Sequence, residues 1–132
     1  MPRPISVKDY MSTNLVTFTP DADVQTAIHD LVVNQISGAP VVDDSGNLVG
    51  MLCERDCLKV ALASGYSAEP GGKVAEFMSQ PVETVNADAS IFDVAGKFIN
   101  GRYHRYPVLE ENRLVGQISR SDVLRAIEQL SI

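Results

Sequence analysis

The chain has 132 residues, of which 45% are hydrophobic and 21% are charged. This balance allows one packed domain, or two very small units sharing a core, and argues against disorder. Eleven basic and seventeen acidic residues give a net charge of −6, the wrong sign for a protein that binds nucleic acid by neutralising phosphates. No apolar run is long enough to span a membrane, and the first residues do not form a secretory signal. We therefore expect a cytoplasmic protein whose main partner is neither nucleic acid nor a membrane.

The sequence repeats itself. Short motifs recur at matching places in its two halves: Val7–Ser12 with Val74–Ser79, Pro40-Val41 with Pro107-Val108, and Leu48–Gly50 with Leu114–Gly116. Recurrence at a nearly constant offset indicates a duplication. We expect one repeat over residues 7–63, a second over 74–130, and between them a linker over 64–73 that contains Gly, Ser and Pro.

In the first copy, the opening segment is followed by an extended piece, Leu15–Phe18. Apolar residues at helical spacing then predict a helix over 24–32. Two strands follow, Ala39–Val42 and Leu48–Leu52, separated by turn-forming residues. A second helix completes the copy.

The second copy has the same order. A helix is expected over 91–99, strands at Tyr106–Leu109 and Leu114–Ile118, and a final helix with its apolar face at Val123, Leu124, Ile127 and Leu130. The order β-α-β-β-α, present twice, predicts an α/β (α+β) fold. Neither copy can bury its helix faces alone, so we expect two pseudo-symmetric repeats packed sheet to sheet with the helices outside.

Two similar segments follow the second hairpin strands: GMLCERD (Gly50–Asp56) and GQISRSD (Gly116–Asp122). Together with the Met-Ser openings and the Pro-Val strands, they make the chain resemble a tandem pair of CBS domains, the Bateman module. The resemblance covers essentially the whole chain. It implies a cleft between the repeats that binds AMP, ADP, ATP or S-adenosylmethionine, with no obligatory cofactor.

The same resemblance implies a regulatory module, not an enzyme. Ligand occupancy would be signalled to an unidentified partner protein, and two copies of the chain would form a homodimer. A different class of protein stays open: a ligand-free dimerisation scaffold in which the same polar residues are structural.

Each Gly-to-Asp segment runs from a strand into a helix. The free N–H groups of a helix start favour phosphate or hydroxyl groups, and an Asp there can accept hydrogen bonds from a ribose diol. The alternative is purely structural, because Ser119 and Asp122 also form a capping box. The first copy has Cys53 in place of the capping Ser, and the retained Asp56 therefore suggests a second task.

The resemblance groups the candidate residues into two pseudo-symmetric sites. The first site comprises Met51, Cys53, Asp56, Val82, Glu83, Tyr103, His104 and Arg105. The second comprises Leu15, Val16, Ile36, Ser37, Gly38, Gln117, Ser119, Arg120 and Asp122. In the first site, Val82 and Glu83 would contact adenine through their backbone, while His104 and Arg105 would bind phosphate.

The two sites differ in charge. The second site has the better ribose-binding end, but it lacks a cationic pair at the position of His104-Arg105. Arg120, beside Asp122, is an alternative source of positive charge there. Cys53 and Cys57 have no further ligands nearby, so no metal site is expected. No nucleophile and base recur together, so no catalytic residue is expected.

Overall fold

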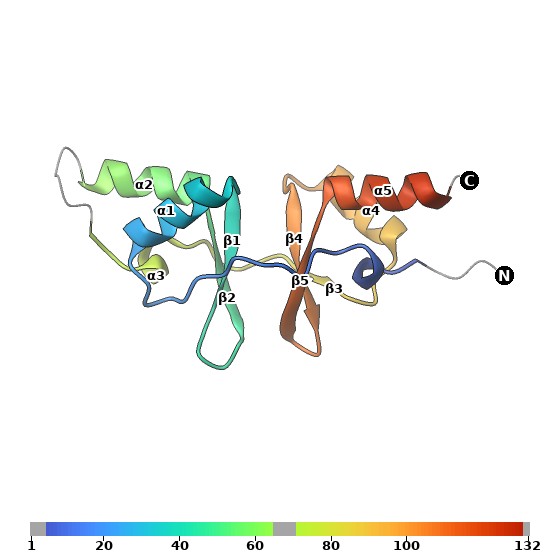
Figure 1. The fold of residues 1–132 in the computed structure, drawn as a ribbon, viewed down its shortest axis with the longest axis horizontal. Helices are drawn as coiled ribbons and strands as arrows, with labels where there is room; N and C mark the ends of the chain where they lie inside the picture. Colours follow the sequence, from blue (N-terminus) through green and yellow to red (C-terminus); the bar gives the residue numbers. More distant parts are fainter. Residues whose placement is uncertain (1–4, 65–70, 131–132) are drawn as a thin grey trace. The chain divides into compact units, whose positions relative to one another are not determined.

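The computed structural model describes residues 5–64 and 71–130, so residues 65–70 of the predicted linker lie outside the described part of the chain. Figure 1 shows the order of the elements. That order is η1 (Val7–Asp9), α1 (Val24–Asn34), β1 (Gly38–Val42), β2 (Leu48–Cys53), α2 (Glu54–Ser64), α3 (Val74–Phe77), β3 (Val85–Asn86), α4 (Ile91–Asn100), β4 (Arg105–Glu110), β5 (Arg113–Ser119) and α5 (Arg120–Leu130). The expected order β-α-β-β-α is confirmed in the second copy, whereas in the first copy no strand precedes α1. The fold is a mixed α and β one.

The chain forms two compact units that do not coincide with the two sequence repeats. The central unit runs from Val16 to Val82, and the terminal unit combines the described residues up to Leu15 with those from Glu83 onward. The opening segment of each repeat therefore belongs to the unit built mainly from the other repeat.

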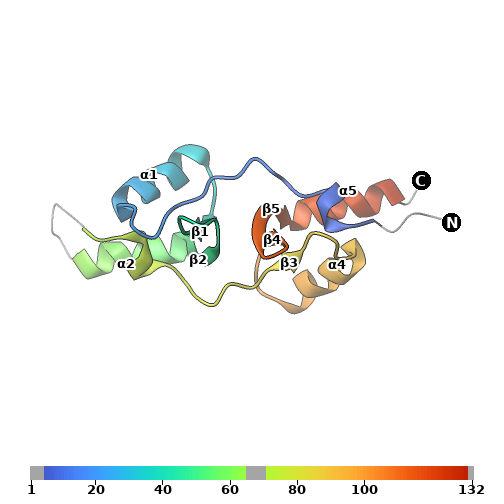
Figure 2. The same ribbon diagram turned by 90° about the horizontal axis from the view of Figure 1, so that it is seen from below.

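The central unit is built on an antiparallel hairpin of β1 and β2. Figures 1 and 2 show α1 and α2 on the same face of this hairpin. The core between them is apolar and includes Ala27, Leu31, Val41 and Leu52. The extended piece predicted at Leu15–Phe18 contributes one bridge, Phe18 with Val41, and no full strand.

The terminal unit contains a three-stranded sheet in the order β3-β4-β5, with β3 parallel to β4 and β4 antiparallel to β5. Helices α4 and α5 contact one another and cover one face of this sheet (Figures 1 and 2). Tyr106, Val108 and Ile118 from the strands meet Val94 and Val123 from the helices in its core. Alternation along β5 and helical spacing along α4 and α5 thus produce one buried face each, whereas β4 is buried at three consecutive residues, Tyr106 to Val108.

Two glycines allow the opening segments to pack closely on the hairpins. A Cβ atom on Gly116 would lie 2.6 Å from the Met11 sulfur and 2.7 Å from the Ser12 carbonyl oxygen. A Cβ atom on Gly50 would lie 2.5 Å from the Met78 sulfur. Real Cβ atoms do not approach so closely, so glycine at these two positions lets each Met-Ser segment sit directly on a strand.

Candidate functional site

The two strand-to-helix junctions, β2 to α2 and β5 to α5, are built alike. The amide of Glu54, the first residue of α2, donates to the carbonyl of Ser37 at 2.9 Å, and that of Arg120, the first residue of α5, donates to His104 at 3.2 Å. The residue before each hairpin therefore satisfies one of the free N–H groups at the start of a helix. This contact brings Ser37 beside α2 and His104 beside α5.

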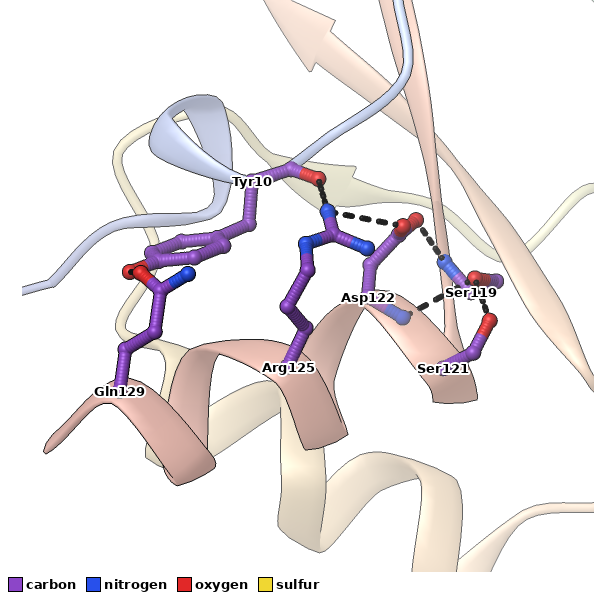
Figure 3. A network of polar contacts seen from close by, with 6 residues as sticks. All are labelled: Tyr10, Ser119, Ser121, Asp122, Arg125 and Gln129. Carbon is purple, nitrogen blue, oxygen red and sulfur yellow. Dashed lines mark hydrogen bonds and ion pairs between the residues drawn. The ribbon is translucent and has the colours of Figure 1, made fainter. Parts of the chain in front are cut away.

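At the α5 junction the capping box is present (Figure 3). The Ser119 amide donates to the Asp122 carboxylate at 2.9 Å, and the Asp122 amide donates to the Ser119 hydroxyl at 3.2 Å. The Asp122 side chain is still 16% exposed, and Arg125 lies 3.3 Å from its Oδ1. The carboxylate thus caps the helix and also keeps an accessible edge.

At the α2 junction Asp56 is more enclosed, with a side chain 2% exposed. Its Oδ2 accepts from the Cys53 amide at 3.0 Å and from the Cys53 thiol at 3.1 Å, and its Oδ1 accepts from the Ser79 hydroxyl at 2.8 Å. Lys59 lies 3.7 Å from Oδ1. The argument that Cys53 leaves Asp56 without a capping task is therefore wrong, because the backbone half of the cap survives.

Burial raises the pKa of the Cys53 thiol, and its hydrogen bond to Asp56 raises it further. The thiol consequently remains protonated at neutral pH and donates to the carboxylate. Ser79 is a contact that the sequence reasoning missed. It lies 23 residues from Asp56, and its only signal in the sequence is the repeated Met-Ser motif.

Arg105, at the start of β4, combines partial burial with unused hydrogen-bonding capacity. Within residues 5–64 and 71–130, its Nε is the one buried side-chain nitrogen or oxygen atom without a hydrogen-bond partner. Buried donors are normally satisfied, and a guanidinium presents its donors in a fork suited to carboxylate or phosphate. The arrangement at Arg105 is therefore suited to an anion.

Two candidate residues, Tyr103 and Glu83, lie near Tyr106, the residue that follows Arg105 in β4. The ring of Tyr103 packs against that of Tyr106, with centroids 5.7 Å apart. Burial raises the pKa of the Tyr106 hydroxyl, and the negative charge of Glu83 raises it further. Glu83 and Tyr103 thus lie near Tyr106 in the terminal unit.

The structure pairs residues that the sequence reasoning had assigned to different sites. Gly38 is in register with Cys53, and Arg105 is in register with Ser119. The central unit carries Val16, Ile36, Ser37, Gly38, Met51, Cys53, Asp56 and Val82. The terminal unit carries Leu15, Glu83, Tyr103, His104, Arg105, Gln117, Ser119, Arg120 and Asp122. Each predicted site therefore draws on both units, and the grouping across them stays a prediction.

The described ranges contain no cluster of three or more His, Cys, Asp or Glu side chains suited to a metal ion. Within those same ranges, every helix falls short of the length and hydrophobicity that crossing a bilayer would require.

Residues 7–63 and 74–129 each match the sequence profile of the CBS domain. The chain belongs to the CBS domain family and carries the domain twice in tandem. The CBS domain-containing protein YhcV of Bacillus subtilis is 31% identical over 126 residues, which cover 96% of this chain and 86% of YhcV. Another relative, an uncharacterized protein of Methanocaldococcus jannaschii, is longer, and the match covers 42% of its length.

Two solved structures agree with this assignment. CBSX2 in complex with AMP superposes with a TM-score of 0.83 at 26% identity, covering 96% of this chain and 98% of CBSX2. The CBS domain pair of protein MJ0100, in complex with 5′-methylthioadenosine and S-adenosyl-L-methionine, superposes with a TM-score of 0.78 at 27% identity, covering 97% and 99%. The fold of this chain is thus that of a CBS domain pair.

The two junctions differ at one capping position, and this difference predicts a change in stability. Cys53→Ser should place a better acceptor opposite the Asp56 amide, as Ser119 does for Asp122, and should stabilise the protein by about 0.5–1 kcal/mol. Urea unfolding measures this change. The matched variant Ser119→Cys should lose a similar amount; destabilisation by Cys53→Ser would show that the thiol bond to Asp56 matters more than the cap.

Proposed function

We propose that the chain is a regulatory module that binds an adenine nucleotide or another adenosyl ligand in the cleft between its two repeats. The buried Nε of Arg105, which lacks a hydrogen-bond partner within the described residues, is the observation that carries this proposal. A bound phosphate would satisfy that donor. The AMP in CBSX2 and the two adenosyl compounds in the MJ0100 pair support the ligand class.

In this proposal the two sites take different ligands. Arg105 and His104 bind the phosphate of AMP, ADP or ATP, and the site is completed by Met51, Cys53 and Asp56 with the backbone of Val82 and Glu83. Because Asp56 already accepts several hydrogen bonds, a ribose hydroxyl there has to displace Ser79 or the thiol.

The second site uses Asp122 for the ribose. Its carboxylate has an exposed edge, and Ser37-Gly38 stands where the first site has His104-Arg105. Without that cationic pair, the second site favours uncharged or cationic adenosyl ligands such as 5′-methylthioadenosine or S-adenosylmethionine over nucleotides.

We further propose that two copies associate and that ligand occupancy is transmitted to a separate protein. Large apolar side chains are exposed on the helices: Leu58 and Leu62 on α2, Phe92 and Ile99 on α4, and Leu124 on α5. Exposed apolar faces of this kind support an interaction surface. Light scattering should give twice the 14.3 kDa mass of one chain; a single-chain mass at micromolar concentration would contradict the dimer.

Thermal unfolding with AMP, ADP, ATP, S-adenosylmethionine and 5′-methylthioadenosine tests the ligand proposal. A ligand present at 100 times its dissociation constant should add about 2.7 kcal/mol to the free energy of unfolding. Inosine serves as a control, because it has the same ribose but a different base. If none of the adenosyl compounds raises the stability at millimolar concentration, the proposal fails and a ligand-free dimerisation scaffold becomes the better description.

A further inference from the structure

Arg125 connects the Asp122 carboxylate to the N-terminal segment of the chain (Figure 3). Its Nη2 lies 3.3 Å from Asp122 Oδ1 and donates to the carbonyl oxygen of Tyr10 at 3.2 Å. The guanidinium also lies over the Tyr10 ring, 5.8 Å from its centroid. Farther along α5, Gln129 accepts a hydrogen bond from the Tyr10 hydroxyl at 2.5 Å. One side chain thus serves both a candidate ligand-binding carboxylate and the opening segment Val7–Ser12.

The equivalent position in the central unit is occupied differently. There Lys59, three residues after Asp56, lies 3.7 Å from the carboxylate. There the opening segment of the second repeat, Val74–Ser79, contacts Asp56 directly through the Ser79 hydroxyl. In the terminal unit the corresponding connection passes through Arg125. A lysine could keep the ion pair with Asp122, but it lacks the fork that also serves the Tyr10 carbonyl.

We propose that Arg125 is a positioning residue that couples the state of the Asp122 carboxylate to the packing of the Val7–Ser12 segment. The part of this inference that concerns a ligand rests on the proposed function. The Arg125 side chain is 52% exposed, so it needs the carboxylate to hold it against Tyr10. A ligand hydroxyl that competes for Asp122 Oδ1 weakens this restraint and loosens the segment.

Backbone hydrogen bonds allow the packing of the Val7–Ser12 segment to be measured at single residues. The amides of Tyr10 and Met11 donate to Val7, and the amide of Ser12 donates to Gln117. The amides of Val7 and Lys8 donate instead to Ala89 and Ala87, before α4. Amide hydrogen exchange at Tyr10, Met11 and Ser12 therefore reports on the Arg125 contact, and exchange at Val7 and Lys8 is an internal reference.

The test without ligand is a double-mutant cycle on the full chain, read by residue-resolved hydrogen exchange. Asp122→Asn and Arg125→Lys should each speed exchange at Tyr10 to Ser12 about tenfold, the loss of one charge-assisted hydrogen bond. Exchange at Val7 and Lys8 should stay within twofold. The combined variant should exchange no faster than either single variant, because both changes break the same connection.

The coupling would be overturned if the two single variants left exchange unchanged, or if their effects were additive in the combined variant. It would also be overturned by equal acceleration at Val7 and Lys8, because the segment would then detach as a whole. Lys59→Gln is the matched control in the central unit and should leave this segment unaffected. Acceleration by Lys59→Gln would also contradict the assignment to Arg125.

The test with ligand uses 5′-methylthioadenosine, which carries no phosphate. Calorimetry should show that Arg125→Lys binds it more tightly than the wild type, by up to about tenfold, because the ligand no longer has to loosen the Arg125–Tyr10 contact. The increase in exchange at Tyr10 to Ser12 caused by the ligand should be lost. Binding by the wild type without any change in exchange would overturn the coupling. An absence of binding by the wild type would defeat the proposed function at this site, and the ligand-free cycle would then decide the coupling alone.

Discussion

Arg105→Ala should weaken AMP binding by at least tenfold. Phosphate held by a guanidinium in a partly desolvated site gains charge-assisted hydrogen bonds, each of which contributes about 1.5–3 kcal/mol, and 1.4 kcal/mol corresponds to a factor of ten in affinity. The net charge of −6 opposes an anionic ligand at long range, which makes this local cation more necessary. Titration calorimetry measures the change.

Arg113→Ala is the matched control, because it removes the same charge at the opposite end of the β4–β5 hairpin. There Arg113 is in register with Glu110 across the two strands. It should change AMP affinity by less than twofold. Arg105→Lys should recover only part of the binding, since lysine lacks the fork. If Asp122→Ala abolished AMP binding while Arg105→Ala had no effect, the phosphate would have been assigned to the wrong site.

Tyr106→Ala should lower the free energy of unfolding by about 3–5 kcal/mol, the range for removing a large aromatic side chain from a core. Tyr106 is 1% exposed. Its ring packs on Phe98 with centroids 4.8 Å apart, and the Lys97 ammonium lies 5.0 Å from its ring centroid. Urea unfolding should show the loss. A value below 1 kcal/mol would mean that this core rearranges to fill the space.

Tyr106→Phe separates the hydroxyl from the ring. It removes only the hydrogen bond donated to the Lys97 carbonyl at 3.3 Å, and should cost about 0.5–1.5 kcal/mol. Burial raises the pKa of this hydroxyl in the folded state, so folding favours the protonated form. The associated stability is complete below about pH 10 and is lost as the pH rises through the folded-state pKa. Tyr106→Phe should remove that part of the alkaline loss.

Local patterns account for most of what was predicted correctly. Residues spaced three and four apart predict a helix over 24–32, and the pattern of apolar residues predicts strands at Leu48–Leu52 and Leu114–Ile118, because each period places one face toward a core. The structure forms all three, with bounds one or two residues wider. The capping box at Ser119 and Asp122 is likewise a local signal, since its two hydrogen bonds join residues three apart. Comparison of the chain with itself reveals the duplication, and the duplication predicts the number of repeats.

The sequence by itself therefore determined the main helices, the two hairpins, the repeat and the aspartate in the first turn of the last helix of each copy. The strand expected at Leu15–Phe18 is reduced to a single bridge. Only the tertiary structure decided which hairpin each opening segment contacts, that Ser79 holds Asp56, and that Arg125 connects Asp122 with Tyr10. The two Met-Ser segments are nearly alike, and so are the strands around Gly50 and Gly116, so either pairing satisfies the local pattern. Contacts between residues 23 to 119 positions apart depend on how the whole chain packs, and no local period encodes them.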